Sequence, residues 1–289
     1  MSHVSPWDRR YPAPAKLNLF LHVIGRRADG YHLLQTVFRL IDRCDWLRFL
    51  PRTDSQVRLA LPLPGIAESD ELAVRAARLL QAETGCAQGA DIAIEKHIPV
   101  GGGLGGGSSD CATALAVLNR LWNLGLPRER LAALALRLGA DVPFFLFGGN
   151  AFAEGVGELL TPIKLPPAWY VVLVPPVRIP TAEVFAAPEL TRNTEPLKMA
   201  DFSAEPGDAR FRNDLEPVVC GRHAAVEAHR AWLGQHGHAR MSGSGACVFA
   251  EFATEREARS VISRMTADMR GFVVRGLDRH PLLALLGEG

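Results

Sequence analysis

The glycine-rich stretch 99–110 has the residue pattern in this chain that is most typical of phosphate binding. It reads Pro-Val-Gly-Gly-Gly-Leu-Gly-Gly-Gly-Ser-Ser-Asp, and glycine allows positive φ and a close approach of the backbone to a ligand. The alanine-rich run 111–118 predicts a helix directly after it, whose N-terminus attracts anions through unpaired N–H groups and its dipole. We therefore expect a nucleotide phosphate here, with Ser108, Ser109 or Asp110 capping the helix.

Three other glycine motifs do not fit this stretch. Gly101, Gly103 and Gly106 form a G-x-G-x-x-G, but a dinucleotide fingerprint needs an acidic residue about 20 residues later, at the end of the next strand. Residues 120–123 read Arg-Leu-Trp-Asn instead, and a helix-like segment follows. A Walker A loop needs a lysine before the serines, and a protein-kinase loop needs V-A-I-K, H-R-D and D-F-G segments. A flexible linker is disfavoured because the loop joins an expected strand, 91–98, to an expected helix.

Lys16 and Asp141 are ionisable residues in restricted or apolar surroundings. Lys16 begins an expected strand within residues 13–24, directly after a turn restricted by proline. A lysine in that place is most often a solvated surface charge. Asp141 is the one acid in the apolar stretch 138–147, so it is either the cap of a short helix or a carboxylate held for a task. The residues alone leave both alternatives open.

Two further segments have residues suited to a ligand. Tyr31 and His32 follow the turn-rich loop 25–30, where they can stack on a ring and hydrogen-bond its edge, although aromatic neighbours more often serve packing. Residues 241–249 read Met-Ser-Gly-Ser-Gly-Ala-Cys-Val-Phe. This second run of small residues is either a tight turn or a place where the backbone approaches the nucleotide.

The elements that must position these residues alternate between strands and helices, which indicates an α+β fold. A composition change near 161–167 separates two halves, and residues 191–212, rich in proline and charge, predict a mobile loop. The expected strands are 44–50, 57–61, 91–98, 170–174, 246–252 and 271–276. The expected helices are 70–84, 110–123, 127–138, a short one capped by Thr181, 214–235 and 255–269.

Composition narrows the classes of function. The 289 residues are 48% hydrophobic and 22% charged, with a formal net charge of +1, which is ordinary for a globular protein and argues against a nucleic-acid surface. No apolar run approaches the roughly 20 residues of a membrane span, and the polar residues 1–10 do not predict a secretory signal. The five cysteines are scattered, so we expect neither a disulfide framework nor a zinc site, and a reducing, cytoplasmic location.

Five segments in the same order and spacing resemble the GHMP kinases, the family of galactokinase, homoserine kinase and mevalonate kinase. The resemblance runs from about residue 11 to residue 280 and implies two α+β domains, 1–160 and 161–289, with the active site in the cleft between them. The segments are Ala-Pro-Ala-Lys-Leu-Asn-Leu at 13–19, Arg-Ala-Asp-Gly-Tyr-His at 27–32, the glycine loop at 101–109, Gly-Ala-Asp-Val-Pro at 139–143 and Ser-Gly-Ser-Gly-Ala at 242–246.

Within this family, the segments are most similar to kinases that act on a cytidine diphosphate sugar alcohol. The resemblance implies that ATP phosphorylates the 2-hydroxyl of 4-diphosphocytidyl-2-C-methyl-D-erythritol, giving the 2-phosphate and ADP, in non-mevalonate isoprenoid precursor synthesis. Such an enzyme binds small molecules rather than nucleic acid or membrane, and we expect a monomer or a weak homodimer. Mg²⁺ is expected to bridge the β- and γ-phosphates, with Ser109 as a candidate ligand.

Site roles follow from the same resemblance. It implies that Asp141 is the catalytic acid/base and that Lys16 is its partner. The implied ATP contacts are Pro99, Val100, Gly101, Gly102, Gly103, Leu104, Gly105, Gly106, Gly107, Ser108 and Ser109. The implied substrate contacts are Tyr31, His32 and Phe185 on the cytosine, Asn18 and Thr181 on the sugar-alcohol side, and Lys96 within reach of a phosphate.

Three alternatives stay open at this point. Another GHMP kinase, acting on homoserine or mevalonate, is disfavoured by Tyr31 and His32, because those substrates have no base to stack. A non-catalytic relative that senses nucleotide is disfavoured by the presence of both Lys16 and Asp141. A nicotinamide oxidoreductase is the third alternative, and tight binding of NADH without ATP would favour it.

Overall fold

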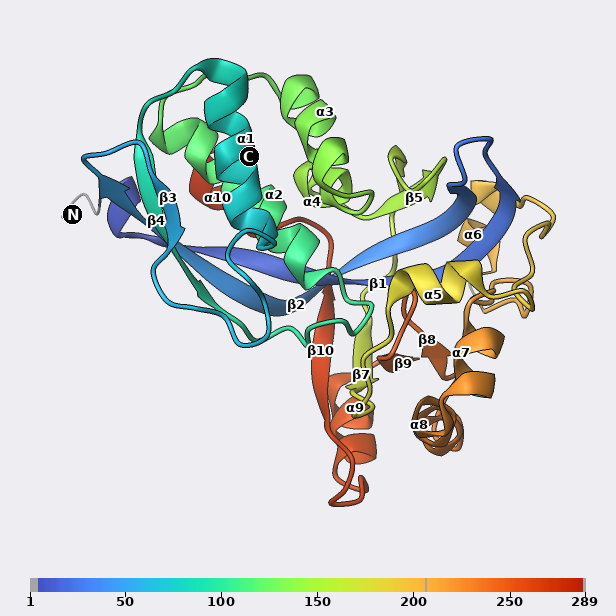
Figure 1. Ribbon diagram of the computed structural model, residues 1–289. Helices are drawn as coiled ribbons and strands as arrows, with labels where there is room; N and C mark the ends of the chain where they lie inside the picture. The colour runs from blue at the N-terminus through green and yellow to red at the C-terminus, as the bar shows by residue number, and fades with distance from the viewer. Residues whose placement is uncertain (1–4, 206, 288–289) are drawn as a thin grey trace.

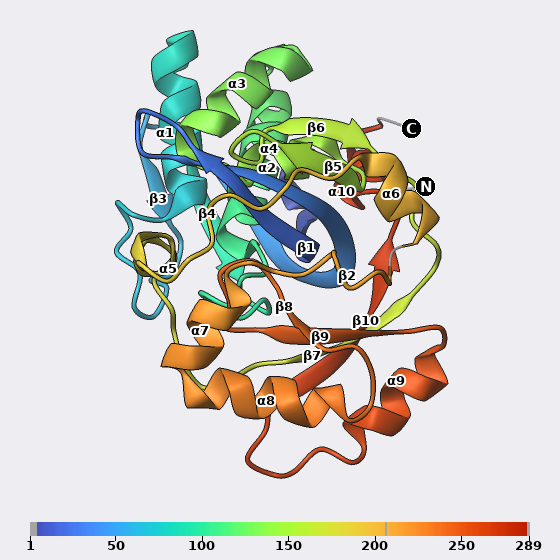
Figure 2. The ribbon, with the colours of Figure 1, turned by 90° about the vertical axis from the view of Figure 1, so that its right-hand side faces the viewer.

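The computed structural model describes residues 5–205 and 207–287, which fold into a mixed α+β structure (Figures 1 and 2). A 3₁₀ turn, Pro6–Asp8, precedes the first strand. The strands are β1 (Arg10–Arg26), β2 (His32–Arg52), β3 (Val57–Leu59), β4 (Gly89–Glu95), β5 (Ala151–Glu154), β6 (Leu159–Pro162), β7 (Trp169–Leu173), β8 (Arg240–Met241), β9 (Val248–Phe252) and β10 (Gly271–Leu277). The helices are α1 (Leu72–Thr84), α2 (Gly106–Leu121), α3 (Arg128–Leu138), α4 (Val142–Phe147), α5 (Thr181–Ala186), α6 (Met199–Ala204), α7 (Glu216–Arg222), α8 (Ala224–Gly234), α9 (Glu255–Ile262) and α10 (Leu282–Leu286).

Within the described residues, ten strands form one sheet whose main path runs β3-β4-β2-β10-β7-β9-β8, while β1 pairs with β2 and β5 bridges β2 and β6. Strand β10 joins the two halves, because it pairs with β2 at one end and with β7 along its length. Helices α1 to α4 lie over the β1–β2–β4 part, and α8 and α9 cover the β7–β9–β10 part on the side away from them (Figure 2). The α+β expectation is confirmed.

The long antiparallel pair β1–β2 crosses the molecule and places residues of the site (Figure 1). The alternation of residues in β1 predicts one face with Leu19, Leu21 and Val23 and another with Asn18, Phe20 and His22. Both faces are buried, so the strand has no solvent side. Its pairing with β2 shifts register three times, and one shift follows Asn18. Such irregularities redirect side chains locally.

Helix α1 confirms the expected helix over 70–84. Glu71 accepts a hydrogen bond from the N–H of Ala73, and Gly85 ends the helix with φ 69°. Helix α2, by contrast, begins at Gly106 after Gly105, whose φ is 73°. Ser108, Ser109 and Asp110 therefore lie inside the helix, and the expectation that one of them caps it is wrong. The glycines continue into the first turn of the helix, where propensity alone disfavours them.

Several expected boundaries need correction. The segment expected as one helix over 214–235 is two helices, α7 and α8, because His223 has extended backbone (φ −130°, ψ 90°). The third expected strand ends at Glu95, and the helix expected over 255–269 ends at Ile262. Thr181 is the first residue of α5 rather than its cap. Helical periodicity does not predict the residue at which tertiary packing ends a helix and turns the chain.

Residues 191–212 are not the loose loop that their composition predicts. The segment contains α6, and the rings of Phe202 and Phe211 pack 5.5 Å and 5.2 Å from the ring of Phe20. The backbone of Leu197 exchanges two hydrogen bonds with the side chain of Gln35. The proline and charge content of the segment gives no indication of these ring contacts and hydrogen bonds.

Candidate active site

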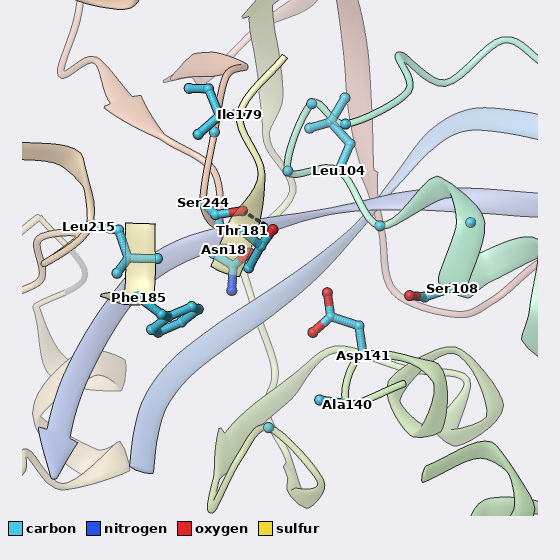
Figure 3. A pocket seen from close by; sticks show the side chains of 18 of the residues that line it. Asn18, Leu104, Ser108, Ala140, Asp141, Ile179, Thr181, Phe185, Leu215 and Ser244 are labelled. Carbon is cyan, nitrogen blue, oxygen red and sulfur yellow. Dashed lines mark hydrogen bonds between the residues drawn. The ribbon is translucent and has the colours of Figure 1, made fainter. Parts of the chain in front are cut away.

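A cavity of about 920 Å³ opens beside β1 and β2, and residues from both ends of the chain line it. Its wall includes the glycine loop, the loop before α4, helix α5 and the loop between β8 and β9. Figure 3 shows this arrangement, with Asp141 and Ser108 on one side and Thr181, Phe185 and Ser244 on another. The size is typical of a small-molecule site.

Backbone contacts hold the glycine loop against β1 and the β8–β9 loop. The carbonyl of Gly102 accepts from the N–H of Cys247 (3.1 Å), and the carbonyl of Leu104 accepts from the N–H of Lys16 (2.9 Å). The carbonyl of Gly103 accepts from the Oγ of Ser242 (3.0 Å). With the loop carbonyls engaged, its N–H groups are the part of the backbone left for an anion.

Gly103 is a position where only glycine fits. Its φ is +74°, and a Cβ there would lie 2.0 Å from the carbonyl oxygen of Ser242. Gly101 also has positive φ, +70°, but a Cβ there would meet open space. The sequence pattern therefore contains glycines of two kinds, one required by a close approach and one required by the backbone angle alone.

Of the two serines after the glycines, the structure brings one to the cavity. Ser108 lines it together with every predicted ATP-contact residue from Pro99 to Gly107. Ser109 is fully buried and is not part of the lining. Its Oγ has no hydrogen-bond partner within the described chain.

Lys16 and Asp141 form an ion pair in the wall of the cavity, with 3.4 Å between Lys16 Nζ and Asp141 Oδ2. The lysine side chain is 3% exposed, and its ammonium also donates to the carbonyl of Gly103 (3.0 Å) and to Asn18 Oδ1 (2.5 Å). Asp141 precedes α4 but makes no capping hydrogen bond with its side chain. Its carboxylate points into the cavity (Figure 3). Lys16 is thus not a solvated surface charge, and although Asp141 stands at the N-cap position of α4, its side chain does not cap the helix.

Two predicted contacts of the sugar-alcohol side lie near this pair. Asn18 is fixed from both ends, because its Nδ2 donates to Thr36 Oγ1 (2.9 Å) while its Oδ1 accepts from Lys16. The hydroxyl of Thr181 lies 2.7 Å from that of Ser244, the contact drawn in Figure 3. The structure therefore gathers Lys16, Asn18, Thr181 and Asp141 in one cavity.

The rings at the other end of the cavity form an aromatic corner. His32 and Phe185 stack with centroids 4.9 Å apart and an interplanar angle of 26°. Tyr31 also lines the cavity but is 63% exposed. Burial lowers the pKa of His32, and the nearby Arg192 and Arg26 lower this pKa further, so the ring is neutral at pH 7.

Lys96 lines the cavity beside the glycine loop, but its charge is already matched. Its ammonium forms ion pairs with the buried carboxylates of Asp45 and Asp110. Burial alone would lower the pKa of Lys96, and Asp110 and Asp45 raise it instead. Burial raises the pKa of Asp110, and the ammonium of Lys96 opposes this shift by favouring the ionised carboxylate. The lysine is thus held at the loop and does not reach freely across the cavity.

Sequence reasoning missed several residues of the lining and one residue outside it, Arg192, that contacts the lining residue His32. Arg192 donates to the ring of His32 from a segment that its composition marked as a loop. Ser244 belongs to the small-residue segment, where a signal was present. The remaining missed positions include Ile66, Glu71, Leu72, Ile98, Val156 and Gly157. The apolar residues among them, such as Ile66, Leu72 and Ile98, give no signal that separates a cavity wall from a core.

Comparison with known proteins identifies the family. The profile described as "GHMP kinases N terminal domain" matches residues 71–149, and that described as "GHMP kinases C terminal" matches residues 192–271. The chain belongs to the GHMP kinases. The predicted family is confirmed. This GHMP kinase therefore uses ATP and acts on a small molecule. Among residues 5–205 and 207–287, no helix is long and apolar enough to cross a membrane.

Individual relatives narrow the comparison. A protein of Thiobacillus denitrificans named 4-diphosphocytidyl-2-C-methyl-D-erythritol kinase is 63% identical over 281 residues, covering 97% of this chain and 100% of that protein. One of the same name from Nitrosospira multiformis is 61% identical over 274 residues, covering 94% of this chain and 92% of that protein. A crystal structure of 4-(cytidine 5'-diphospho)-2C-methyl-D-erythritol kinase matches with a TM-score of 0.80 at 36% identity, covering 93% of this GHMP kinase and 99% of that chain.

Proposed function

We propose that this GHMP kinase transfers the γ-phosphoryl group of ATP to the 2-hydroxyl of 4-diphosphocytidyl-2-C-methyl-D-erythritol, giving the 2-phosphate and ADP. The observation that carries the proposal is the Lys16–Asp141 pair beside the glycine loop, in one cavity with the stacked rings of His32 and Phe185. The names of relatives at 61–63% identity support the same substrate. The product belongs to non-mevalonate isoprenoid precursor synthesis.

The glycine loop is the proposed seat of the ATP phosphates. Its N–H groups can compensate charge on the transferred oxygens without reorganising. The apolar residues Ile66, Leu72 and Ile98 line the cavity next to the loop and suit the adenine ring. Lys96 forms ion pairs with Asp45 and Asp110, so we propose that it lies beside the phosphates without binding one of them by itself.

Asp141 is the proposed general base. The acceptor is a tertiary alcohol, which is hindered and a very weak acid, and Asp141 can take its proton as the new P–O bond forms. Lys16, 3.4 Å away, keeps the carboxylate ionised and can polarise the hydroxyl. Asn18 and Thr181 are proposed to orient the sugar alcohol, because the in-line geometry of phosphoryl transfer depends on alignment.

Mg²⁺ fits this arrangement as an ion carried mainly by phosphates. Among the described residues, no group of three or more His, Cys, Asp or Glu is placed to hold a metal by itself. Mg²⁺ commonly takes few protein ligands and keeps several waters. Ser108, which lines the cavity, is the hydroxyl ligand that the geometry favours; Ser109, the ligand expected from the sequence, is fully buried behind the lining and would have to turn toward the cavity to bind the ion. When bound, Mg²⁺ neutralises charge on the β- and γ-phosphates.

The aromatic corner is the proposed cytosine site. Tyr31 and Phe185 offer ring faces for stacking, and His32 offers a ring nitrogen for the edge of the base. Homoserine and mevalonate have no base, so neither substrate would contact the rings of the aromatic corner. The Lys16–Asp141 geometry likewise disfavours a non-catalytic sensor.

Other parts of the expectation stay proposals. We propose a division into residues 1–160 and 161–289, a cytoplasmic location in keeping with five free cysteines, and a monomer or weak homodimer that binds no nucleic acid. Sedimentation of the purified protein at micromolar concentration tests the oligomeric state.

The experiment that tests the function is ADP release by the purified protein with ATP and Mg²⁺. The cytidine diphosphate substrate is offered beside homoserine and mevalonate. Turnover with the cytidine substrate alone is expected, and we expect it to be lost in Asp141→Asn. Turnover with another alcohol would keep the phosphate site and remove the roles given to Tyr31, His32 and Phe185. ATP binding without any turnover would favour the sensor.

A further inference from the structure

Arg192 connects the two sides of the aromatic corner. Its Nε donates to His32 Nε2 (3.2 Å), while its Nη2 donates to the carbonyls of Phe185 (2.8 Å) and Ala187 (2.7 Å). Its Nη1 donates to the carbonyl of Leu190 (3.0 Å). One half-buried guanidinium thus connects the start of β2 to the end of α5, and it fixes the position of the His32 ring relative to Phe185.

The hydrogen bond to His32 determines which ring nitrogen carries the proton. A guanidinium has only donors, so His32 Nε2 must accept, and the ring must be neutral. The proton of a neutral imidazole then lies on the other nitrogen, Nδ1. Within the described chain Nδ1 has no hydrogen-bond partner, and His32 lines the cavity. The site therefore offers a fixed N–H donor at Nδ1.

We propose that Arg192 is a specificity-determining residue, which fixes the Nδ1–H tautomer of His32 so that the site accepts cytosine and rejects uracil. This inference rests on the proposed function, since it takes the aromatic corner as the base site. Arg192 does not touch the reacting atoms, so it is a positioning residue.

The chemistry of the two bases explains the discrimination. At position 3 of the ring, cytosine has a bare nitrogen that accepts a hydrogen bond, whereas uracil has an N–H that donates. A fixed Nδ1–H donor matches the cytosine nitrogen and leaves two donors opposed when uracil is bound. An imidazole free to change tautomer would present either a donor or an acceptor and would distinguish the bases poorly. Sites with fixed hydrogen-bonding groups discriminate strongly against a ligand that leaves them unpaired.

Arg192→Met tests the proposal by removing all donors from a side chain of similar length. The measurement is kcat/KM for the cytidine diphosphate substrate and for its uridine diphosphate counterpart. We expect the preference for cytidine to fall by about tenfold or more, through a higher KM for cytidine with little change in kcat. Equal losses for both substrates would overturn the proposal, because they would indicate a purely structural role.

Two further variants keep the test decisive. Arg192→Lys retains a positive charge near the carbonyls at the end of α5 and covers the case in which the methionine variant fails to fold. We expect it to lose base preference as well. Arg210→Met is the matched control, because Arg210 is exposed and its side chain pairs with Asp208 outside the cavity. It should keep the wild-type preference.

Nitrogen NMR of the His32 ring gives a readout that does not depend on turnover. We expect the wild-type protein to carry the proton on Nδ1, and the Arg192 variants to show a mixture of tautomers. A proton on Nε2 in the wild-type protein would overturn the proposal. If the wild-type protein turns over neither nucleotide substrate, the proposed function fails, and the ring tautomer still tests the geometry.

Discussion

The two ends of the cavity, the proposed phosphate end at the glycine loop and the proposed base end at the aromatic corner, hold their positions by different means. At the phosphate end, backbone groups of the glycine loop lie against Ser242, Cys247 and Lys16, and the lysine is almost fully buried. At the base end, the rings of His32 and Phe185 stack on each other, and the side chain of Arg192 donates a hydrogen bond to the ring of His32.

This difference is in keeping with what each end is proposed to recognise. Phosphate charge is compensated by fixed N–H groups that need no reorganisation, so a rigid backbone is well suited. A base is recognised by its faces and by the donors and acceptors on its edge, which require side chains. We therefore expect changes at the phosphate end to reduce kcat or ATP affinity, and changes at the base end to alter the KM of the acceptor.

Asp141→Asn should have the largest effect. The amide keeps the size of the side chain but cannot take the proton of the acceptor alcohol, so kcat should fall by about 10²–10⁴-fold. KM for either substrate should change little, because shape is preserved. ADP release under saturating ATP measures the loss. Asp208→Asn, which changes a half-buried carboxylate outside the cavity, should keep wild-type turnover. A fall in kcat of less than tenfold would remove Asp141 from its role.

Gly103→Ala should have the next largest effect, and Gly101→Ala is its matched control. Both glycines have positive φ, so either alanine should cost about 1–2 kcal/mol of stability through backbone strain. The Cβ at Gly103 also overlaps the carbonyl of Ser242, so the loop must move. We expect KM for ATP to rise by about tenfold or more in Gly103→Ala only. Thermal unfolding and ATP titration measure the two parts. Equal KM values in the two variants would contradict the close approach.

The phosphate end was largely predictable because its signal is local. Six glycines close together indicate a backbone that binds an anion, and no distant residue is needed to see it. The pairing of Lys16 with Asp141 was different. From the residues alone, Lys16 could equally be a surface charge and Asp141 a helix cap. Only the family resemblance paired them, because the sequence does not show which distant positions lie close together in the fold.

The base end was less predictable, for physical reasons. Tyr31 and His32 were found as neighbours, but the partner that fixes His32 lies in a segment rich in proline and charge, where composition predicted a mobile loop. Arg192 is fixed by carbonyls of α5, and such contacts depend on where the chain turns. The break between α7 and α8 was missed for the same reason, since periodicity continues through it.

Phe185→Leu should have a moderate effect, confined to the acceptor substrate. Loss of the aromatic face removes stacking with a base, which is typically worth about 1–3 kcal/mol, so KM for the cytidine substrate should rise by about tenfold. KM for ATP and kcat should stay within about threefold. Phe252→Leu, on β9 and outside the cavity, controls for the general loss of a ring. A fall in kcat with unchanged KM would place Phe185 at the phosphate end and would break the comparison.

The smallest expected effect is the pH dependence of acceptor binding. Burial, Arg192 and Arg26 lower the pKa of His32 below its usual 6.5, so the neutral ring that accepts from Arg192 persists as the pH falls past that value. Protonation leaves the Nδ1–H in place but makes Nε2 a donor that opposes the guanidinium of Arg192, so the ring loses its anchor and binding weakens as pH falls through the lowered pKa. KM for the cytidine substrate should be flat from about pH 8 to 6.5 and rise a few-fold at lower pH. Arg192→Met should shift this rise to higher pH, since one cause of the lowered pKa is gone. A rise in KM centred at or above pH 6.5 in the wild-type protein would mean that His32 is not held neutral, and the fixed donor at the base end would lose its basis.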